Sequence, residues 1–433
     1  MGKGILLLLS GIVVLTGIIQ TRSDQRNKIL PEKNAEYYNE VQARNVSKSL
    51  IDNAIELMKK NTDWAGSISS DSNYFGSGTL TSYTINSDSY PADHSVTSWD
   101  QYKILLNSIG RFEKDGVTYE VTTEVLMRQD SYSKYSYLTE SELSSSGSNI
   151  WFWDKDELWG PIHTNGTYKM SGSPTFNGLT TSPNMWDGHP TNPTSPVFNG
   201  GSNFFAPYKS PPDSYELSKL TSAASSGGIT YSNQIEVDFY EYSNEGYVNI
   251  REYSSGSWSS WDSHKLSDTN GIISTSGRID VKGVVKGSVT LHSETLIEID
   301  GDITYSTNPI VDSTSTDLLG LVSEGSVRID RDAHTASGTQ DLDIHATIMA
   351  LNTSFYVESY WTGSSRGKLN LLGGIVQKNR GAVGTFSGTS IVSGYTKNYQ
   401  YDNRLRSQIP PEFPRESIFS ILYWKDKVSK VGS

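Results

Sequence analysis

The chain repeats one pattern in Ile279-Asp-Val-Lys-Gly-Val-Val285 and Ile297-Glu-Ile-Asp-Gly-Asp-Ile303, at a spacing of eighteen residues. Apolar residues alternate with polar ones in both segments, which is typical of strands that bury one face. A glycine interrupts each segment where a strand would bend. A repeat of this length cannot bury its apolar face alone, so the pattern predicts a solenoid in which each rung stacks its inward side chains on the next.

Short apolar segments of the same kind lie on both sides of this repeat. Further rungs are predicted at Val327–Ile329, Ile344–Ile348, Phe355–Val357, Leu369–Leu371 and Ile375–Val376. Residues 159–180 show similar short pieces separated by Gly166, Gly172 and Gly178. We therefore predict a parallel β-helix over residues 159–180 and 271–392, with an antiparallel β-sandwich as the alternative.

Residues 181–270 interrupt this rhythm and predict an insertion. Residues 184–212 are rich in Pro, Asn and Gly and indicate a long loop, whereas 213–226 predict a short helix and 235–250 a hairpin. Insertions on one face of a solenoid are often where partners bind. After the repeats, Ile418–Trp424 is apolar enough to predict a strand that caps the open end of the solenoid.

The N-terminal third has a different character. Apolar residues recur at helical spacing from Glu32 to Asn61, and together with Ile5–Ile19 they predict a long helix that is interrupted or kinked near Pro31. Strands follow at 76–86 and 104–127, the second region with an Asp115-Gly116 turn that predicts a hairpin. One helix on a small antiparallel sheet is the expected result.

The segment Ile5–Ile19 is the most apolar part of the chain. As a helix it would be about 22 Å long. A helix that crosses a bilayer comfortably has roughly 20 residues and spans about 30 Å, so this segment is short for that role. A cleaved secretory signal is one interpretation, but residues 18–23 offer no Ala-x-Ala pattern of the kind that ends such a signal, so we favour a helix that stays attached. Only Lys3 and the amino terminus precede the segment, so charge does not fix its orientation.

This start resembles type IV pilins and type II secretion pseudopilins, whose short basic leader is cut after a Gly just before the apolar helix. The resemblance implies a leader-peptidase junction between Gly4 and Ile5, here preceded by Lys3. The fifth residue after that junction is Leu9, where most such proteins have Glu. Minor pilins of the PilX and GspK classes also lack this Glu. A plain signal anchor followed by a surface helix is the alternative.

A second resemblance covers most of residues 150–425. Trp159–Leu179, Ile344–Val357, Gly367–Gln377 and Arg380–Gly384 are similar to a bacterial family known only as a domain of unknown function, whose members pair a pilin-like helix with a Gly-rich β domain. The family brings no established activity, so no functional residue is carried over from it.

These observations predict a mainly β chain with a long N-terminal α-helix, in which a parallel β-helix (solenoid) body follows a small pilin-like α+β head. We expect residues 1–28 to be leader and membrane anchor, 29–135 the pilin-like helix and antiparallel sheet, and 136–433 the β-helix domain with its insertion at about 181–270.

Composition excludes several kinds of function. The chain of 433 residues has no cysteine, which rules out disulfides, thiol nucleophiles and Cys-based metal sites. Its net charge of −12 argues against nucleic acid as a partner. No P-loop, Rossmann fingerprint or Gly-x-Ser-x-Gly elbow occurs. The sequence thus predicts no catalytic residues and no resident cofactor.

Two groups of side chains remain as candidates for binding. The acidic pairs Asp300/Asp302, Asp330/Asp332 and Asp341/Asp343 have the oxygen ligands that calcium prefers, or the paired carboxylates of a glycosidase, although solvated turns use the same residues. Four tryptophans form a possible ligand surface for sugars, or else a small core under a long loop: Trp151, Trp153, Trp159 and Trp186. Late basic residues, Arg380 and Arg404 among them, are expected to pair within the molecule.

We therefore expect a membrane-anchored, non-enzymatic cell-surface protein, either a minor pilin-like subunit or a pilus-assembly component, with a projecting β-helical domain. Its expected partners are pilin-like subunits or pilus-assembly proteins, the membrane through the N-terminal helix, and surface polysaccharide. The expected location is the cell envelope, anchored in the inner membrane with the body in the periplasm or at the cell surface. The alternative is an extracellular β-helix protein that binds or cleaves polysaccharide.

Overall fold

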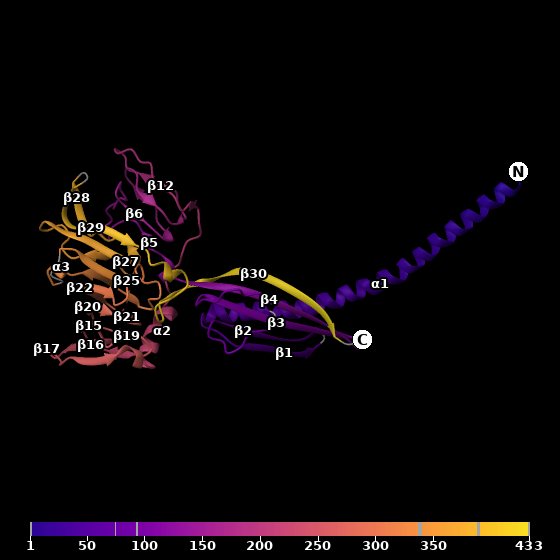
Figure 1. The fold of residues 1–433 in the computed structure, drawn as a ribbon, viewed down its shortest axis with the longest axis horizontal. Coiled ribbons are helices and arrows are strands. Elements are labelled where there is room, and N and C mark those ends of the chain that lie inside the picture. The colour runs from indigo at the N-terminus through magenta and orange to yellow at the C-terminus, as the bar shows by residue number, and fades with distance from the viewer. Residues whose placement is uncertain (1, 74, 92–93, 337–339, 388–389, 432–433) are drawn as a thin grey trace. The chain divides into compact units, whose positions relative to one another are not determined.

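The computed structural model describes residues 2–73, 75–91, 94–336, 340–387 and 390–431. The chain forms two compact units, which we call the head (Met1–Gln129 with Ile418–Ser433) and the body (Asp130–Ser417). The prediction of a mainly β chain with a long N-terminal helix is confirmed (Figure 1).

The first element is α1 (Gly2–Lys60), which contains Pro31 and remains helical through it. The predicted interruption near Pro31 is therefore wrong, whereas the alternative, a kink there, stays a prediction. A proline removes one intrahelical hydrogen bond and crowds the preceding turn, but the turns on either side keep their own bonds and the helix continues. Within the described part of the chain, no helix combines the length and apolar character needed to span a bilayer.

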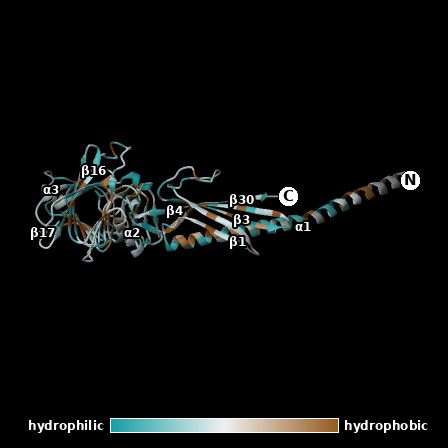
Figure 2. Cartoon of the chain, turned by 90° about the horizontal axis from the view of Figure 1, so that it is seen from below, coloured by the Kyte–Doolittle hydropathy of each residue, from teal (hydrophilic) through white to brown (hydrophobic). Residues whose placement is uncertain are grey.

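The two halves of α1 differ in burial. Leu50, Ile51, Ala54 and Met58 in its second half are buried against the sheet of the head. Apolar residues of its first half are exposed, and they form a brown segment of α1 in Figure 2: Ile12, Val13, Val14, Leu15, Ile18 and Ile19. The second half thus holds the head together, while the first half presents an apolar surface.

The head sheet has the strand order β1-β2-β3-β4-β30. Its strands are β1 (Ser67–Asn73), β2 (Gly76–Tyr83), β3 (Lys103–Lys114), β4 (Val117–Ser131) and β30 (Arg415–Val431). The predicted hairpin is confirmed, because β3 and β4 pair in antiparallel register from Lys103↔Arg128 to Lys114↔Val117. Asp115 and Gly116 both have positive φ, as a two-residue type I′ turn requires.

The helix α1 approaches this sheet very closely at Gly110 on β3. A Cβ atom there would lie 2.2 Å from the carbonyl oxygen of Ala43 and 2.5 Å from the amide nitrogen of Ser47. The hydroxyl of Ser47 donates to the carbonyl of Ser108 at 3.1 Å, and the hydroxyl of Ser108 donates to the carbonyl of Ser47 at 3.0 Å. Small residues on both elements therefore set the distance between helix and sheet.

The strand predicted at Ile418–Trp424 exists as part of β30, but its predicted role as a cap on the solenoid is wrong. It lies beside β4 in the head sheet, where Phe419 packs against the core formed by α1, β2 and β3. The local pattern of apolar residues predicts a strand, but it does not specify which sheet that strand joins.

The body consists mainly of parallel strands that form three ladders. The first ladder contains β14 (Ile229–Tyr231), β19 (Ile272–Thr275), β21 (Ser288–Ser293), β23 (Leu318–Ser323), the end of β25 (Leu342–Ala350), the end of β27 (Ser365–Asn379), β5 (Tyr137–Ser141), β7 (Ile162–Thr164), β10 (Thr180–Ser182) and β13 (Ser202–Phe204).

The other two ladders share long strands with the first. The second contains β15 (Ile235–Tyr242), the starts of β20 (Ile279–Val285) and β22 (Leu296–Tyr305), β24 (Ser326–Ile329) and β26 (Phe355–Val357). The third contains the ends of β20 and β22, the starts of β25 and β27, and β29 (Ser390–Gln400). The predicted antiparallel alternative is wrong for these ladders, and the parallel β-helix itself stays a prediction.

The remaining elements of the body are short. Two small parallel sheets contain β6 (Glu157–Leu158), β9 (Thr175–Phe176) and β12 (Val197–Phe198), and β8 (Lys169–Met170) with β11 (Asp187–Gly188). Antiparallel strands are β16 (Glu245–Ser254), β17 (Ser257–Trp258), β18 (Asp262–Lys265) and β28 (Gly384–Ser387). The helices are α2 (Ser214–Ser225), α3 (Ala333–Ala336), η1 (Tyr132–Lys134), η2 (Leu266–Asp268) and η3 (Asn403–Arg406).

The eighteen-residue repeat is only partly a structural repeat. Ile279 pairs with Ile297 and Val281 with Ile299, as their spacing predicts. The register then shifts, so that Gly283 pairs with Ile303 and not with Gly301. Residues 300–302 of β22 therefore lie opposite Lys282 alone, as in a bulge on β22. Next to this bulge, Gly283 has a φ of 112°, a backbone conformation that residues with a side chain rarely adopt.

In the predicted insertion, the helix (α2) and the hairpin (β15–β16) are both confirmed. Asp213 caps α2 by accepting a hydrogen bond from the amide of Glu216 at 2.9 Å. Both β14 and β15 pair in parallel with rungs of the repeat, β19 and β20, so the ladders continue through this segment.

Candidate functional site

The strand β27 divides between two ladders. Its first part pairs with β29 as far as Leu372↔Gln400, and its last part pairs with β5 from Ile375↔Tyr137 onward. Between the two parts lies Gly373, with a φ of 146° and its would-be Cβ only 1.9 Å from the carbonyl oxygen of Ala346. Only glycine fits there. Since β29 and β5 follow different halves of one strand, they diverge, and a cavity opens between them.

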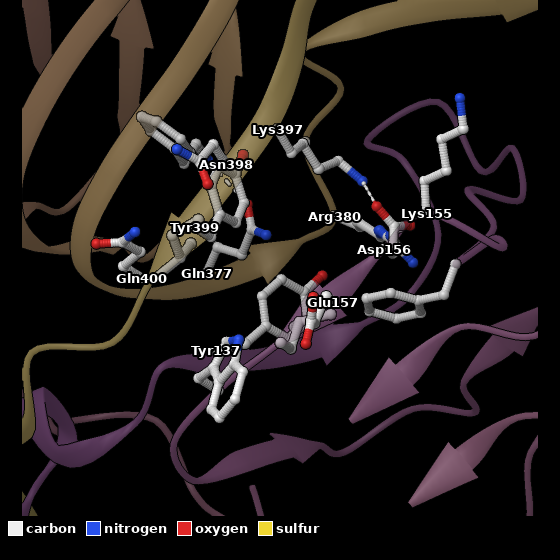
Figure 3. Close-up of a pocket in the computed structure, with 16 residues that line it drawn as sticks. Tyr137, Lys155, Asp156, Glu157, Gln377, Arg380, Lys397, Asn398, Tyr399 and Gln400 are labelled. Carbon is white, nitrogen blue, oxygen red and sulfur yellow. Dashed lines mark hydrogen bonds and ion pairs between the residues drawn. The ribbon is translucent and has the colours of Figure 1, made fainter. Parts of the chain in front are cut away.

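This cavity, which we call the fork pocket, has a volume of about 320 Å³ and lies entirely within the body. Figure 3 shows its side chains coming from β5, β27, β29 and the turn before β6. The lining residues that the following paragraphs use are Tyr137, Phe152, Asp156, Glu157, Trp159, Gln377, Arg380 and Lys397.

Arg380 forms the innermost part of the fork pocket and is only 3% exposed. Its guanidinium lies 3.5 Å from the centre of the Phe152 ring, and its Nη1 donates to Glu142 Oε2 at 3.2 Å and to the carbonyl of Ile150 at 3.0 Å. Glu142 is also buried and accepts a hydrogen bond from the hydroxyl of Thr139. The predicted pairing of the late arginines within the molecule is confirmed here, and also for Arg404, which pairs with Asp402.

A second ion pair crosses the pocket from β29 to the turn before β6. Lys397 Nζ donates to Asp156 Oδ1 at 3.1 Å, as the dashed line in Figure 3 marks. Burial lowers the pKa of Lys397, and the neighbouring Asp156 carboxylate opposes that effect. Asp156 also lies 3.9 Å from the guanidinium of Arg380. Both cations of the interior thus face carboxylates.

Two polar groups of the lining have hydrogen-bonding capacity left. The Tyr137 hydroxyl is buried and lies against the side chain of Gln377, but its own proton finds no acceptor among the described residues; burial, with the Glu142 carboxylate adding to it, raises its pKa well above the usual value. Gln377 uses its side-chain oxygen to accept from the amide of Phe355 at 2.9 Å, and its side-chain NH2 carries two more donors. A buried polar atom without a partner is costly, which marks this wall as a place for a ligand or water.

The rim of the fork pocket is partly exposed. Trp159 is 52% exposed and lines the cavity, and Glu157 accepts a hydrogen bond from Asn177 at 2.7 Å. An aromatic face beside polar groups at the mouth of a cavity suits a ligand that has both apolar and hydroxylated surfaces.

Of the four tryptophans predicted as a ligand surface, Trp159 is the one that lines the fork pocket. Trp151 contacts the ring of His189 at 4.7 Å, Trp153 lies 5.2 Å from the ring of Phe386, and Trp186 packs against the core of the body. The four rings thus contact different neighbours, and the common ligand surface stays a prediction. For the predicted leader junction, the backbone of Gly4 and Ile5 is helical, and their side chains lie outside the described residues.

No motif in the sequence marks Tyr137, Gln377 or Lys397 as residues of a site. They lie far apart along the chain and meet only because β27 divides between two ladders. The local signal that exists is a polar residue, Gln377, directly after the run Leu371–Val376, which has no polar side chain.

The acidic residues gather differently from the prediction. Asp280, Glu298 and Asp300 have oxygen atoms within 4.8 Å of one another. Asp300 therefore belongs to a cluster with Asp280 and Glu298, whereas the sequence predicts a pair with Asp302. Arg278 contacts both Asp280 and Glu298, and Arg328 contacts Glu298. A calcium ion would compete with these guanidinium groups for the same oxygens, and the calcium site stays a prediction.

We expect Asp300→Asn to stabilise the protein at about pH 8. Burial, and the nearby carboxylates of Asp280, Glu298 and Asp330, raise the pKa of Asp300 to about 7, from a usual value of 3.8. The folded state therefore binds this proton more tightly than the unfolded state, and the stability that it contributes is lost as the pH rises from about 4 to about 7. The amide of Asn does not titrate, so the variant should not lose this stability. At about pH 8 we expect its free energy of unfolding to exceed that of the native chain by on the order of 1 kcal/mol, after allowance for solvent screening.

The measurement is urea unfolding of the full chain at about pH 4 and about pH 8. The exposed Asp332→Asn variant is the control and should show no such pH-dependent difference. Equal stability of the Asp300→Asn variant and the native chain at both pH values would contradict the assignment.

Comparison with known proteins adds little to this geometry. Residues 105–184 match a family described as a domain of unknown function (DUF4900). This match covers the hairpin β3–β4 and the first short strands of the body. The sequence predicts such a resemblance over most of residues 150–425, and the match overlaps only the start of that range. No curated protein matches. Among solved structures, the chain is similar to the competence-associated pilin ComZ from Thermus thermophilus, at 11% identity, a TM-score of 0.31, and coverage of 90% of this chain and 98% of that one.

Proposed function

We propose that this protein is a membrane-anchored, non-enzymatic subunit of the cell envelope, of the minor pilin or pilus-assembly type, whose body is a parallel β-helix. The observation that carries the proposal is the division of α1. Its second half is buried on an antiparallel sheet by Leu50, Ile51 and Met58, and its first half exposes a run of apolar residues. A helix that is half structural core and half exposed apolar surface suits a subunit that inserts among other helices in a membrane or filament.

The sequence supports the same assignment through the Lys3-Gly4 pair in front of Ile5, which resembles a pilin leader junction. Leu9 in place of the usual Glu favours a minor position. A carboxylate at that place would neutralise the amino terminus of a neighbouring subunit in an apolar environment, and this chain cannot supply one. We therefore place the subunit at a filament tip or in a priming complex, where such pairing is not repeated.

The non-enzymatic part of the proposal rests on the chemistry of the fork pocket. Its innermost carboxylate, Asp156, contacts both Lys397 and Arg380, and Glu157 accepts a hydrogen bond from Asn177. Neither carboxylate is placed as an unengaged acid or base, which the paired-carboxylate chemistry of glycoside cleavage needs.

Mass spectrometry of the mature N-terminus tests the proposal. We expect a chain that begins at Ile5, because a pilin-type leader is cut directly before the apolar helix. We also expect the protein to co-purify with pilus-assembly proteins at low stoichiometry. A chain that keeps Met1, a cut after Ile19, or recovery as the bulk subunit of sheared filaments would each contradict it.

A further inference from the structure

We propose that the fork pocket binds a neutral hexopyranose unit of an extracellular polysaccharide. This inference does not depend on the pilus assignment, because every lining residue belongs to the body. It makes the body a carbohydrate-binding module, whatever holds the protein at the cell surface.

The inner wall of the pocket supplies the hydrogen-bonding groups. The buried Tyr137 hydroxyl lies against the side chain of Gln377, and its own proton finds no acceptor among the described residues. The side-chain NH2 of Gln377 carries two donors, of which one faces that hydroxyl and the other is left for a ligand. Both residues lie on adjacent paired strands, since β5 and β27 run side by side at Gln377↔Thr139 and Val376↔Leu138. Sugar hydroxyls both donate and accept, so one ring can satisfy a hydroxyl and an amide together.

The charges of the interior favour an uncharged ligand. Arg380 already faces the buried Glu142, and Lys397 faces Asp156. A phosphate, sulfate or uronate entering the pocket would meet these carboxylates as well as the cations, and it would have to break a buried ion pair to gain one of its own. A polyol gains hydrogen bonds without that cost.

Size and the aromatic rim favour a ring-shaped ligand. The volume of about 320 Å³ is at the lower end of ligand pockets, which range over about 300–1,000 Å³, and so suits one or two sugar rings. Trp159 at the mouth exposes its ring, and the C–H face of a pyranose packs well on such a ring.

Isothermal titration calorimetry of the full chain in detergent tests the proposal. The probes are neutral trisaccharides of glucose, galactose, mannose and N-acetylglucosamine, with trigalacturonate and inorganic sulfate as the anionic comparison. We expect binding of at least one neutral trisaccharide and none of the anions. Binding of the anions alone, or of no probe, would overturn the proposal.

Two variants locate the site. Trp159→Ala should weaken the binding of the neutral trisaccharide roughly tenfold through loss of the ring surface. Tyr137→Phe should weaken it by roughly the same factor. Its thermal stability should change little, because the removed hydroxyl loses at most its contact with the Gln377 side chain.

Trp261→Ala is the matched control, since Trp261 is also exposed, at 43%, and is not among the fork pocket's lining residues. Unchanged affinity in both pocket variants, or an equal loss in the control, would show that the sugar binds elsewhere and would refute the assignment. Because Tyr137→Phe removes a single oxygen, loss of binding with retained thermal stability separates a binding role from a merely structural one.

Discussion

Replacing Arg380 with methionine is expected to lower the free energy of unfolding of the body by about 3–5 kcal/mol, the usual cost of removing one partner from a buried ion pair. Among the described residues, the substitution leaves the buried Glu142 carboxylate with the hydroxyl of Thr139 as its remaining side-chain hydrogen-bond donor. It also deprives the carbonyl of Ile150 of its donor and the Phe152 ring of its cation. The protein therefore loses stability because buried polar groups lose their partners, and not because the side chain becomes smaller.

Thermal and urea unfolding of the full chain, followed by tryptophan fluorescence, measure this effect. Adding Glu142→Gln to Arg380→Met should recover part of the stability, because the buried charge is then gone. Arg331→Met is the control, since the side chain of Arg331 is 58% exposed and its pairing with Asp332 is at the surface. A loss in Arg380→Met as small as in that control would show that Glu142 finds another partner.

Gly110→Ala is expected to destabilise the head by about 3 kcal/mol, at the upper end of what overpacking costs. The added methyl group would lie 2.2 Å from the carbonyl oxygen of Ala43 and 2.5 Å from the amide nitrogen of Ser47. Both obstacles are backbone atoms of α1, which cannot move aside as a flexible side chain does. The helix must shift from the sheet and weaken the reciprocal bonds between Ser47 and Ser108.

Hydrogen exchange of the α1 amides over residues 43–58 reports this shift, and we expect markedly faster exchange there while the body is unaffected. Gly66→Ala serves as the control because the nearest atom to its new methyl group is 3.7 Å away, in the ring of Trp64. Native protection of α1 in the Gly110→Ala variant would contradict the close approach of helix and sheet.

Local patterns in the sequence predict much of this fold, and long-range relations account for what they miss. The hairpin β3–β4 follows from alternating residues and one Asp-Gly turn, all within a short segment. Leu369–Leu371 and Ile375–Val376 were correctly predicted as strand residues, but as two rungs. They form the single strand β27, because Gly373 bends the chain without ending the strand.

The fork pocket is harder to predict for the same reason. Of its lining, sequence analysis singled out Trp159 as a candidate ligand residue and expected Arg380 to pair within the molecule. Tyr137, Gln377 and Lys397 carry no pattern that distinguishes them from other strand residues. Their meeting depends on which half of β27 each neighbouring strand joins, and that choice is decided by the register of whole ladders.

The position of β30 also has a consequence for how the protein is made. The first element of the chain, α1, and the last strand, β30, belong to the same head, and the whole body is encoded between them. During synthesis, the helix therefore emerges long before the strand that completes its sheet. The body can begin to fold as soon as its own residues are available, whereas the head must wait for the C-terminus. A chain that is cut short after the body would keep its ladders and yet lack β30, so only a chain that includes this last strand forms a complete head sheet.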